Sequence, residues 1–143
     1  MFDNRDNVEF TYYGMEGATV MGPKPQLTRV FVNLITNSVQ AIDIQQQDAA
    51  DAGREPGTGR VTVSLRNSSQ EGYYDIVFED NGPGVNPENQ PKLFTPNFTT
   101  KSAGTGLGLA ICRSILEKCG AEISYSKSFT LSGACFTIRY PKE

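Results

Sequence analysis

The chain has 143 residues, of which 38% are hydrophobic and 20% charged, and its formal net charge is −3. This length fits one domain spanning 1–143, and the composition is that of an ordinary soluble globular protein rather than a disordered chain. The slightly acidic charge, without any Lys/Arg-rich run, argues against nucleic acid or an anionic membrane surface as a partner. The sequence has no histidine, which excludes Ser-His and Cys-His catalysis, histidine metal sites and self-contained phosphohistidine chemistry.

The three cysteines, Cys112, Cys119 and Cys135, show no C-x-x-C spacing. They are typical of buried free thiols in a reducing compartment. No apolar run approaches the roughly 20 residues that a membrane span needs. We therefore expect a cytoplasmic domain that makes no direct membrane contact.

The N-terminal part changes from a strand pattern to a helix pattern. Residues 8–13 are rich in aromatic and β-branched residues and predict a strand, with 18–20 as a candidate short partner. From Gln26 onward, apolar residues recur at steps of three and four, which predicts an amphipathic helix that fades at 45–47. The following residues 48–59 are typical of a flexible surface loop.

The middle of the chain predicts a hairpin followed by a long irregular segment. Residues 60–65 alternate between apolar and polar and 73–79 form a second strand pattern, so 67–72 suits a hairpin connection. Residues 80–103 are rich in Gly, Pro and Asn and show little periodicity. A loop of that length is typical of a functional lid or a disordered segment.

The C-terminal part predicts a second helix and a second hairpin. Residues 107–119 carry helical periodicity, and Gly120 stands where a C-terminal cap belongs. Residues 121–126 and 135–140 predict strands around a turn near Gly133. The order of elements indicates an α/β (α+β) fold, a two-layer sandwich with a mixed β-sheet covered on one face by helices.

Three amides, Asn33, Asn37 and Gln40, form one stripe beside the apolar arc of the first helix. A buried amide needs partners for several donors and acceptors, and an Asn oxygen is a suitable hard ligand for Mg²⁺. The plainer interpretation is a solvated helix flank.

The DNGPG sequence at 80–84 directly follows the second strand of the first hairpin. A carboxylate at the end of a strand, followed by glycines, can accept a hydrogen bond from a flat ligand such as adenine. Taken alone, the same residues also suit a hairpin turn.

The GTGLGL sequence at 104–109 opens the second helix, where backbone amides bind phosphate well. Its spacing is neither that of a dinucleotide fingerprint nor that of a P-loop. Just upstream, Thr99, Thr100 and Lys101 stand where they could reach phosphate, and Phe94 could anchor the lid together with Phe98. Taken alone, the glycine string could also be structural.

Together these sequences resemble a known family. NLITN at 33–37 resembles the N box of the GHKL ATPases (gyrase, Hsp90, MutL and histidine kinases), and DNGPG at 80–84 resembles their G1 box. LFTPNFTTK at 93–101 and GTGLGL at 104–109 resemble the F and G2 boxes of histidine kinases, most like the nitrogen-regulation (NtrB-like) branch. GACFTIRYP at 133–141 is similar to the closing strand of the family.

The resemblance implies a Bergerat fold that binds ATP and Mg²⁺, and it implies roles by position. Asn37 would hold Mg²⁺ and Asn33 would support the phosphates. Asp80 would bind the adenine amine, in a pocket shaped by Gly82 and Gly84.

The resemblance also places nucleotide-binding residues in the lid and the glycine string. Lys101 would be the phosphate cation. The other implied positions are Thr100, Gly104, Thr105, Gly106, Leu107 and Gly108. Two departures from the family are Gln40, where many histidine kinases have Lys or Arg, and Asn97, which replaces an aromatic residue.

Hydrolytic members of the family carry a Glu at the position of Asn33, and Asn has no useful basicity for activating water. A neutral imidazole is already a nucleophile, so phosphoryl transfer to histidine needs mostly positioning and metal charge. The resemblance therefore implies the catalytic domain of a sensor histidine kinase. Its partners would be a separate histidine-containing dimerisation domain and, indirectly, a response regulator receiver domain. The alternatives are a GHKL ATPase, an anti-sigma-type serine kinase and a nucleotide-binding pseudokinase.

Overall fold

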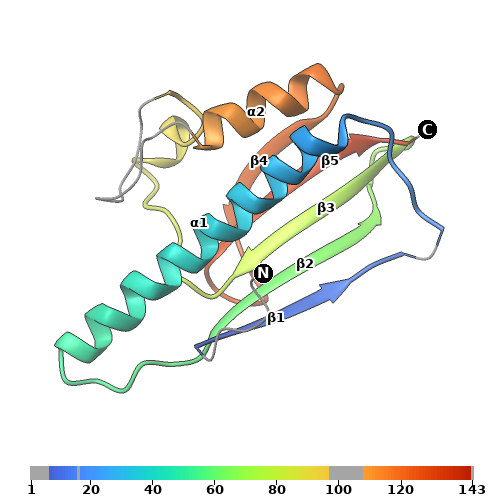
Figure 1. The fold of residues 1–143 in the computed structure, drawn as a ribbon. Coiled ribbons are helices and arrows are strands. Elements are labelled where there is room, and N and C mark those ends of the chain that lie inside the picture. Colours follow the sequence, from blue (N-terminus) through green and yellow to red (C-terminus); the bar gives the residue numbers. More distant parts are fainter. Residues whose placement is uncertain (1–6, 16, 97–107, 143) are drawn as a thin grey trace.

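The structure, a computed structural model, describes residues 7–15, 17–96 and 108–142. One five-stranded sheet has the order β1-β2-β3-β5-β4, and two helices, α1 and α2, lie on the same face of it (Figure 1). The elements are β1 (Val8–Tyr13), α1 (Lys24–Asp51), β2 (Gly59–Asn67), β3 (Tyr73–Asp80), the 3₁₀ helix η1 (Gln90–Lys92), α2 (Gly108–Lys118), β4 (Glu122–Lys127) and β5 (Ala134–Pro141). This is the two-layer α/β sandwich that the sequence predicts.

The sheet is mixed because β1 and β2 run parallel, whereas the other neighbours are antiparallel. Two adjacent parallel strands need a long crossover connection, and α1 is the helix in that connection. The helix packs over β2 and β3 and contacts α2 along its other side. One element therefore closes the sheet topology and also carries the amide stripe.

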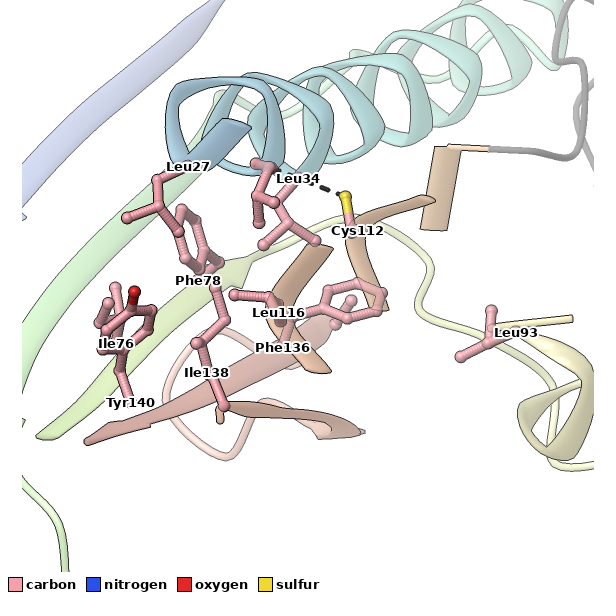
Figure 2. Packing of buried hydrophobic residues seen from close by; sticks show 13 residues of the cluster. Leu27, Leu34, Ile76, Phe78, Leu93, Cys112, Leu116, Phe136, Ile138 and Tyr140 are labelled. Atoms are coloured by element: carbon pink, nitrogen blue, oxygen red, sulfur yellow. Dashed lines mark hydrogen bonds between the residues drawn. The ribbon is translucent and has the colours of Figure 1, made fainter. Parts of the chain in front are cut away.

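The core lies between the sheet and the helices and is built in rows across the strands. Phe78 on β3 is paired with Phe136 on β5, and Ile76 is paired with Ile138. All four side chains are buried, and Leu34 of α1 belongs to the same buried cluster (Figure 2). The strand alternation that places Ile76 and Phe78 on this face also places Asp80 on it.

Three sequence-based expectations about the N-terminal half are wrong. Residues 18–20 form no strand, because β1 pairs with β2, and Val20 instead packs against the core. The first helix does not fade at 45–47, and 48–51 are not loop, because α1 continues to Asp51. Ala49 is buried under this last part, and Gln47 Nε2 donates to Asp51 Oδ1 at 2.9 Å, so packing and a side-chain bond extend the helix.

The remaining described elements agree with the predicted ones to within one or two residues at each end. Gly120 has φ of +74°, the left-handed conformation expected after a helix end. The irregular segment after β3 contains η1, and Leu93 beside it is buried. Phe94 packs edge-to-face on Phe136 with ring centroids 6.2 Å apart, as an anchor should, while Phe98 lies outside the described residues.

Among the helices described, none is long and apolar enough to cross a membrane. Of the three cysteines, all free, Cys112 and Cys135 are buried and Cys119 is half-buried.

The last strand is tied to the segment that leads into α1. Tyr140 on β5 is 2% exposed, and its hydroxyl donates to the carbonyl oxygen of Met21 at 2.7 Å. Burial raises the pKa of Tyr140 to about 12, so the hydroxyl keeps its proton and remains a donor.

We expect Tyr140→Phe to lower the free energy of unfolding by about 0.5–1.5 kcal/mol, because one intramolecular hydrogen bond is lost while the ring still fills its place. Urea unfolding followed by circular dichroism measures this. Tyr13→Phe is the matched control, since Tyr13 is 62% exposed and should tolerate the change. Equal stability of Tyr140→Phe and wild type would show that the bond to Met21 contributes nothing.

Candidate functional site

The centre of the site is the carboxylate of Asp80, the last residue of β3. It is 2% exposed and faces the helix-covered side of the sheet. Its Oδ1 atom accepts the backbone N–H of Gly82 at 2.9 Å and that of Ala134 on β5 at 3.2 Å. A buried charge needs such partners, and two N–H donors also hold the carboxylate in one orientation.

Two glycines make this arrangement possible by letting the backbone come close. A Cβ at Gly82 would lie 3.1 Å from Asp80 Oδ1 and 3.5 Å from the Cβ of Ala41 on α1. A Cβ at Gly133 would lie 2.6 Å from Asp80 Oδ1 and 2.7 Å from the nitrogen of Gly82. Such distances leave no room for a side chain at position 133, so Gly133 is part of the site.

Beyond Gly82 the chain is held by β4. Gly84 has φ of +72°, a left-handed conformation that favours glycine. The next residue, Val85, donates its N–H to the hydroxyl oxygen of Tyr125 at 3.0 Å. Burial, and to a lesser extent the Asp80 carboxylate, raises the pKa of Tyr125, so its phenol stays neutral beside the site.

The amide stripe lies on the part of α1 next to this turn. Asn33 and Asn37 are half-buried and Gln40 is exposed, so the two asparagines lie at the edge of the buried face and only Gln40 is on a solvated flank. The Asp80 turn therefore lies against the helix that carries the N-box asparagines: Gly82 approaches Ala41, which is one turn beyond Asn37 on α1.

Asn33 also connects the two helices. Its Nδ2 donates to the Sγ of Cys112 on α2 at 3.7 Å. That sulfur in turn donates to the carbonyl oxygen of Val30 at 3.9 Å, the contact dashed in Figure 2. Cys112 is fully buried, and burial raises the pKa of its thiol, so the sulfur is a protonated packing group. This contact holds the N-terminal half of α2 beside the N box.

Six of the sequence-predicted nucleotide residues lie outside the described residues, and their places stay predictions. They are Thr100, Lys101, Gly104, Thr105, Gly106 and Leu107. Of the predicted set, the structure describes Asn33, Asn37, Asp80, Gly82, Gly84 and Gly108.

Residues 22–143 match the family described as histidine kinase-, DNA gyrase B-, and HSP90-like ATPase. This chain belongs to that family. The match covers β2 to β5, both helices and every predicted site residue.

Curated relatives of the chain are sensor histidine kinases and sensor proteins. It is 39% identical over 116 residues to the sensor histidine kinase ZraS of Salmonella typhimurium, and these residues cover 81% of this chain and 22% of ZraS. It is 30% identical over 140 residues to the swarming motility regulation sensor protein RssA of Serratia marcescens, covering 96% of this chain and 27% of RssA. The chain therefore spans about a quarter of the length of these relatives.

Solved structures agree with this placement. The catalytic domain of the histidine kinase ThkA, in a nucleotide-free form, is 27% identical with a TM-score of 0.75, over 95% of this chain and 80% of that one. The mycobacterial sensor histidine kinase MprB is 25% identical with a TM-score of 0.77, over 97% of this chain and 86% of that one. The predicted resemblance to GHKL histidine kinase catalytic domains and the predicted fold are confirmed.

Sequence reasoning missed two residues of the site, Gly133 and Tyr125. For Gly133 the sequence predicts a turn and the start of the closing strand, and for Tyr125 only a place in a strand. Both come from the C-terminal hairpin, about 40 to 50 residues beyond the DNGPG sequence. No local pattern marks them, because their role follows from strand pairing.

We expect Gly133→Ala to lower the free energy of unfolding by about 1–3 kcal/mol, because the added methyl group forces the Asp80 turn away from β5. Urea unfolding measures the loss. Gly57→Ala is the control, since a Cβ at Gly57 meets nothing within 4 Å. If Gly133→Ala proved as stable as Gly57→Ala, the close contact between position 133 and the turn would be wrong.

Proposed function

We propose that this chain binds Mg-ATP and transfers its γ-phosphoryl group to a histidine on a separate dimerisation domain, in two-component signalling. The observation that carries the proposal is the pairing of an ATPase-family domain related to sensor histidine kinases with a chain that contains no histidine. The phosphohistidine on that domain would then supply a response regulator receiver domain. The reaction would take place in the cytoplasm, where the parent kinase could still be anchored to the membrane elsewhere.

The adenine end of ATP would bind at Asp80. Its carboxylate would accept a hydrogen bond from the 6-amino group, where hypoxanthine and guanine carry a carbonyl oxygen instead. The buried, doubly hydrogen-bonded state of Asp80 supports this, because a rigid acceptor recognises a donor without losing further freedom. The glycines at 82 and 84 would leave space for a flat ring beside α1.

The phosphate end would lie between α1 and the start of α2. Asn37 would hold Mg²⁺ through its amide oxygen, and Asn33 would support the phosphates. The described residues contain no group of three His, Cys, Asp or Glu that could hold a metal ion. A single amide oxygen is compatible with Mg²⁺, which takes few protein ligands and keeps waters and phosphate oxygens. Bound Mg²⁺ would neutralise charge on the phosphates.

In the transfer step an imidazole nitrogen of the acceptor domain forms a bond to the γ-phosphorus. The bond from that phosphorus to the bridging oxygen breaks, and ADP leaves. This chain would hold ATP in position and exclude water from it. The groups proposed at the phosphates are Lys101 and the backbone amides of Gly104, Gly106 and Gly108. Thr100, Thr105 and Leu107 belong to the same proposed segment.

Transfer to histidine is preferred to hydrolysis because of Asn33. Its side chain donates to Cys112 and has no basicity with which to activate water. The chain therefore offers a place for ATP but no base at the position where hydrolytic relatives carry Glu.

We expect Asn37→Ala to remove most of the Mg²⁺-dependent part of ATP affinity while leaving the fold intact, since Asn37 lies at the edge of the core. Calorimetric titration of ATP with and without Mg²⁺ measures the difference. Gln40→Ala is the matched control on the same helix, because Gln40 is exposed. Equal Mg-ATP affinity of Asn37→Ala and wild type would refute the metal assignment.

The isolated chain should bind ATP, should not label itself on histidine and should hydrolyse ATP slowly. Added to the histidine-containing domain of its parent kinase with radiolabelled ATP, it should place acid-labile, alkali-stable phosphate on that domain. Transfer should be slow, because separating the two domains lowers their effective concentration. Fast hydrolysis by the chain alone, with no transfer to the histidine domain, would favour the ATPase branch of the family.

A further inference from the structure

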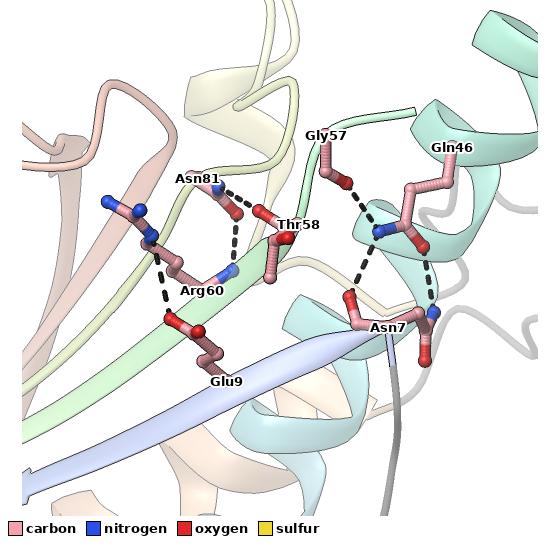
Figure 3. Close-up of polar contacts among 7 residues, drawn as sticks. All are labelled: Asn7, Glu9, Gln46, Gly57, Thr58, Arg60 and Asn81. Carbon is pink, nitrogen blue, oxygen red and sulfur yellow. Dashed lines mark hydrogen bonds and ion pairs between the residues drawn. The ribbon is translucent and has the colours of Figure 1, made fainter. Parts of the chain in front are cut away.

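The start of β2 is held from three sides by polar contacts (Figure 3). From α1, Gln46 Nε2 donates to the carbonyl oxygen of Gly57 at 2.9 Å and to that of Asn7 at 3.0 Å. From the residue before β1, the carbonyl oxygen of Asn7 accepts the N–H of Gly59 at 2.9 Å, and Asn7 Nδ2 donates to Gln46 Oε1 at 2.7 Å and to Asp43 Oδ1 at 2.9 Å. From the DNGPG turn, Asn81 Nδ2 donates to the carbonyl oxygen of Thr58 at 2.9 Å.

Asn81 ends the β2–β3 ladder in an unusual way. Asp80 is paired with Val61, so Asn81 lies opposite Arg60. The N–H of Asn81 donates to the carbonyl oxygen of Arg60 at 3.1 Å, but the N–H of Arg60 donates at 2.6 Å to the side-chain Oδ1 of Asn81. The side chain thus takes the place of a main-chain acceptor, and the backbone after Asn81 is free to leave the sheet.

The departure of the backbone is what builds the Asp80 turn. Directly after Asn81, the N–H of Gly82 turns back to Asp80 Oδ1 at 2.9 Å. Gly82 then lies against α1, with its hypothetical Cβ 3.5 Å from that of Ala41. If β3 continued as regular strand, the N–H of residue 82 would not point at the carboxylate.

The contacts of Gln46 and Asn81 fall on consecutive residues. Gln46 bonds α1 to Gly57, and Asn81 bonds the turn to Thr58. Both elements are therefore attached to the same short segment, residues 57–59, which we call the corner. The next residue, Gly59, is packed so closely under α1 that a Cβ there would lie 2.5 Å from Ile42 Cγ2. The distance between α1 and the Asp80 turn is therefore set through this corner.

We propose that Asn81 is a positioning residue for adenine recognition, which acts by fixing the Asp80 turn relative to α1 without touching the nucleotide. The inference rests on the proposed function, because it takes Asp80 as the acceptor of the adenine amine. Both halves of the Asn81 amide are used, Oδ1 as acceptor and Nδ2 as donor, so no other side chain of this size and charge replaces it.

The test compares dissociation constants for ATP and inosine triphosphate, which has a carbonyl oxygen in place of the 6-amino group. Wild type should bind ATP more tightly. Asn81→Ala removes both side-chain bonds and should reduce this preference by about three- to tenfold. This is the range expected when the hydrogen bond from the 6-amino group to the Asp80 carboxylate is misaligned. Loss of stability alone would weaken both nucleotides equally and leave the ratio unchanged.

Two further variants sharpen the test. Asn81→Asp keeps the acceptor for Arg60 and loses the donor to Thr58, so it should reduce the preference less than Asn81→Ala; its added charge affects both triphosphates alike. If Asn81→Ala does not fold, Asn81→Asp alone tests the positioning role. Asp75→Asn is the control on the same strand: Asp75 pairs with Arg139 at 3.3 Å, five residues before Asp80. This change should lower stability and leave the ratio at the wild-type value.

The outcomes separate this inference from the function on which it rests. If wild type prefers ATP and both Asn81 variants keep the full preference, the positioning role is wrong and the proposed site survives. If wild type binds ATP and inosine triphosphate equally, Asp80 is not the adenine acceptor, and this inference is overturned with that assignment.

Discussion

The burial of one carboxylate constrains much of this domain. Asp80 ends β3 on the helix-covered face, in the position where the preceding residues of that face, Ile76 and Phe78, are core. A charge at that place is costly unless it is hydrogen-bonded, and the chain supplies two backbone N–H groups to one oxygen. The absence of side chains at 82 and 133 follows from this requirement, since a Cβ at either position would crowd the carboxylate.

The first helix connects this carboxylate with the rest of the site. α1 is the crossover between two parallel strands and runs along the sheet. Because it is long, it carries Asn33 and Asn37 in its middle and Gln46 near its end, all on the side of the sheet that Asp80 faces. Its buried arc packs on the central strands, so the amides at its edge have fixed positions. A helix held by the core on one side and by a polar corner at its end is a rigid support for ligand-binding side chains.

The polar contacts around Gly57 and Thr58 join elements that are far apart in the chain. Hydrogen bonds from Gln46 and Asn81 end on the adjacent carbonyl groups of Gly57 and Thr58, and the carbonyl oxygen of Asn7, the residue before β1, accepts the N–H of Gly59. The Asp80 turn, α1 and the first strand are therefore connected through three consecutive residues, 57–59. Family membership accounts for the motifs, while this corner accounts for how their relative position is maintained.

Local pattern in the sequence was sufficient for the type of most elements, whereas the candidate ligand residues followed from the resemblance to the family and stay predictions. Period-two and period-3.6 alternation report which side of an element is buried, and Asp, Asn, Gly and Pro report where the backbone turns, so the two helices, the hairpins and the DNGPG turn were predicted correctly. The tertiary structure decided which elements meet. The parallel pairing of β1 with β2, the extension of α1 to Asp51 over a buried Ala49, and the contacts of Gly133 and Tyr125 with the Asp80 turn all join residues far apart in the chain. A single sequence records the buried face of each strand but not the strand that pairs with it, because burial has a local period and pairing does not.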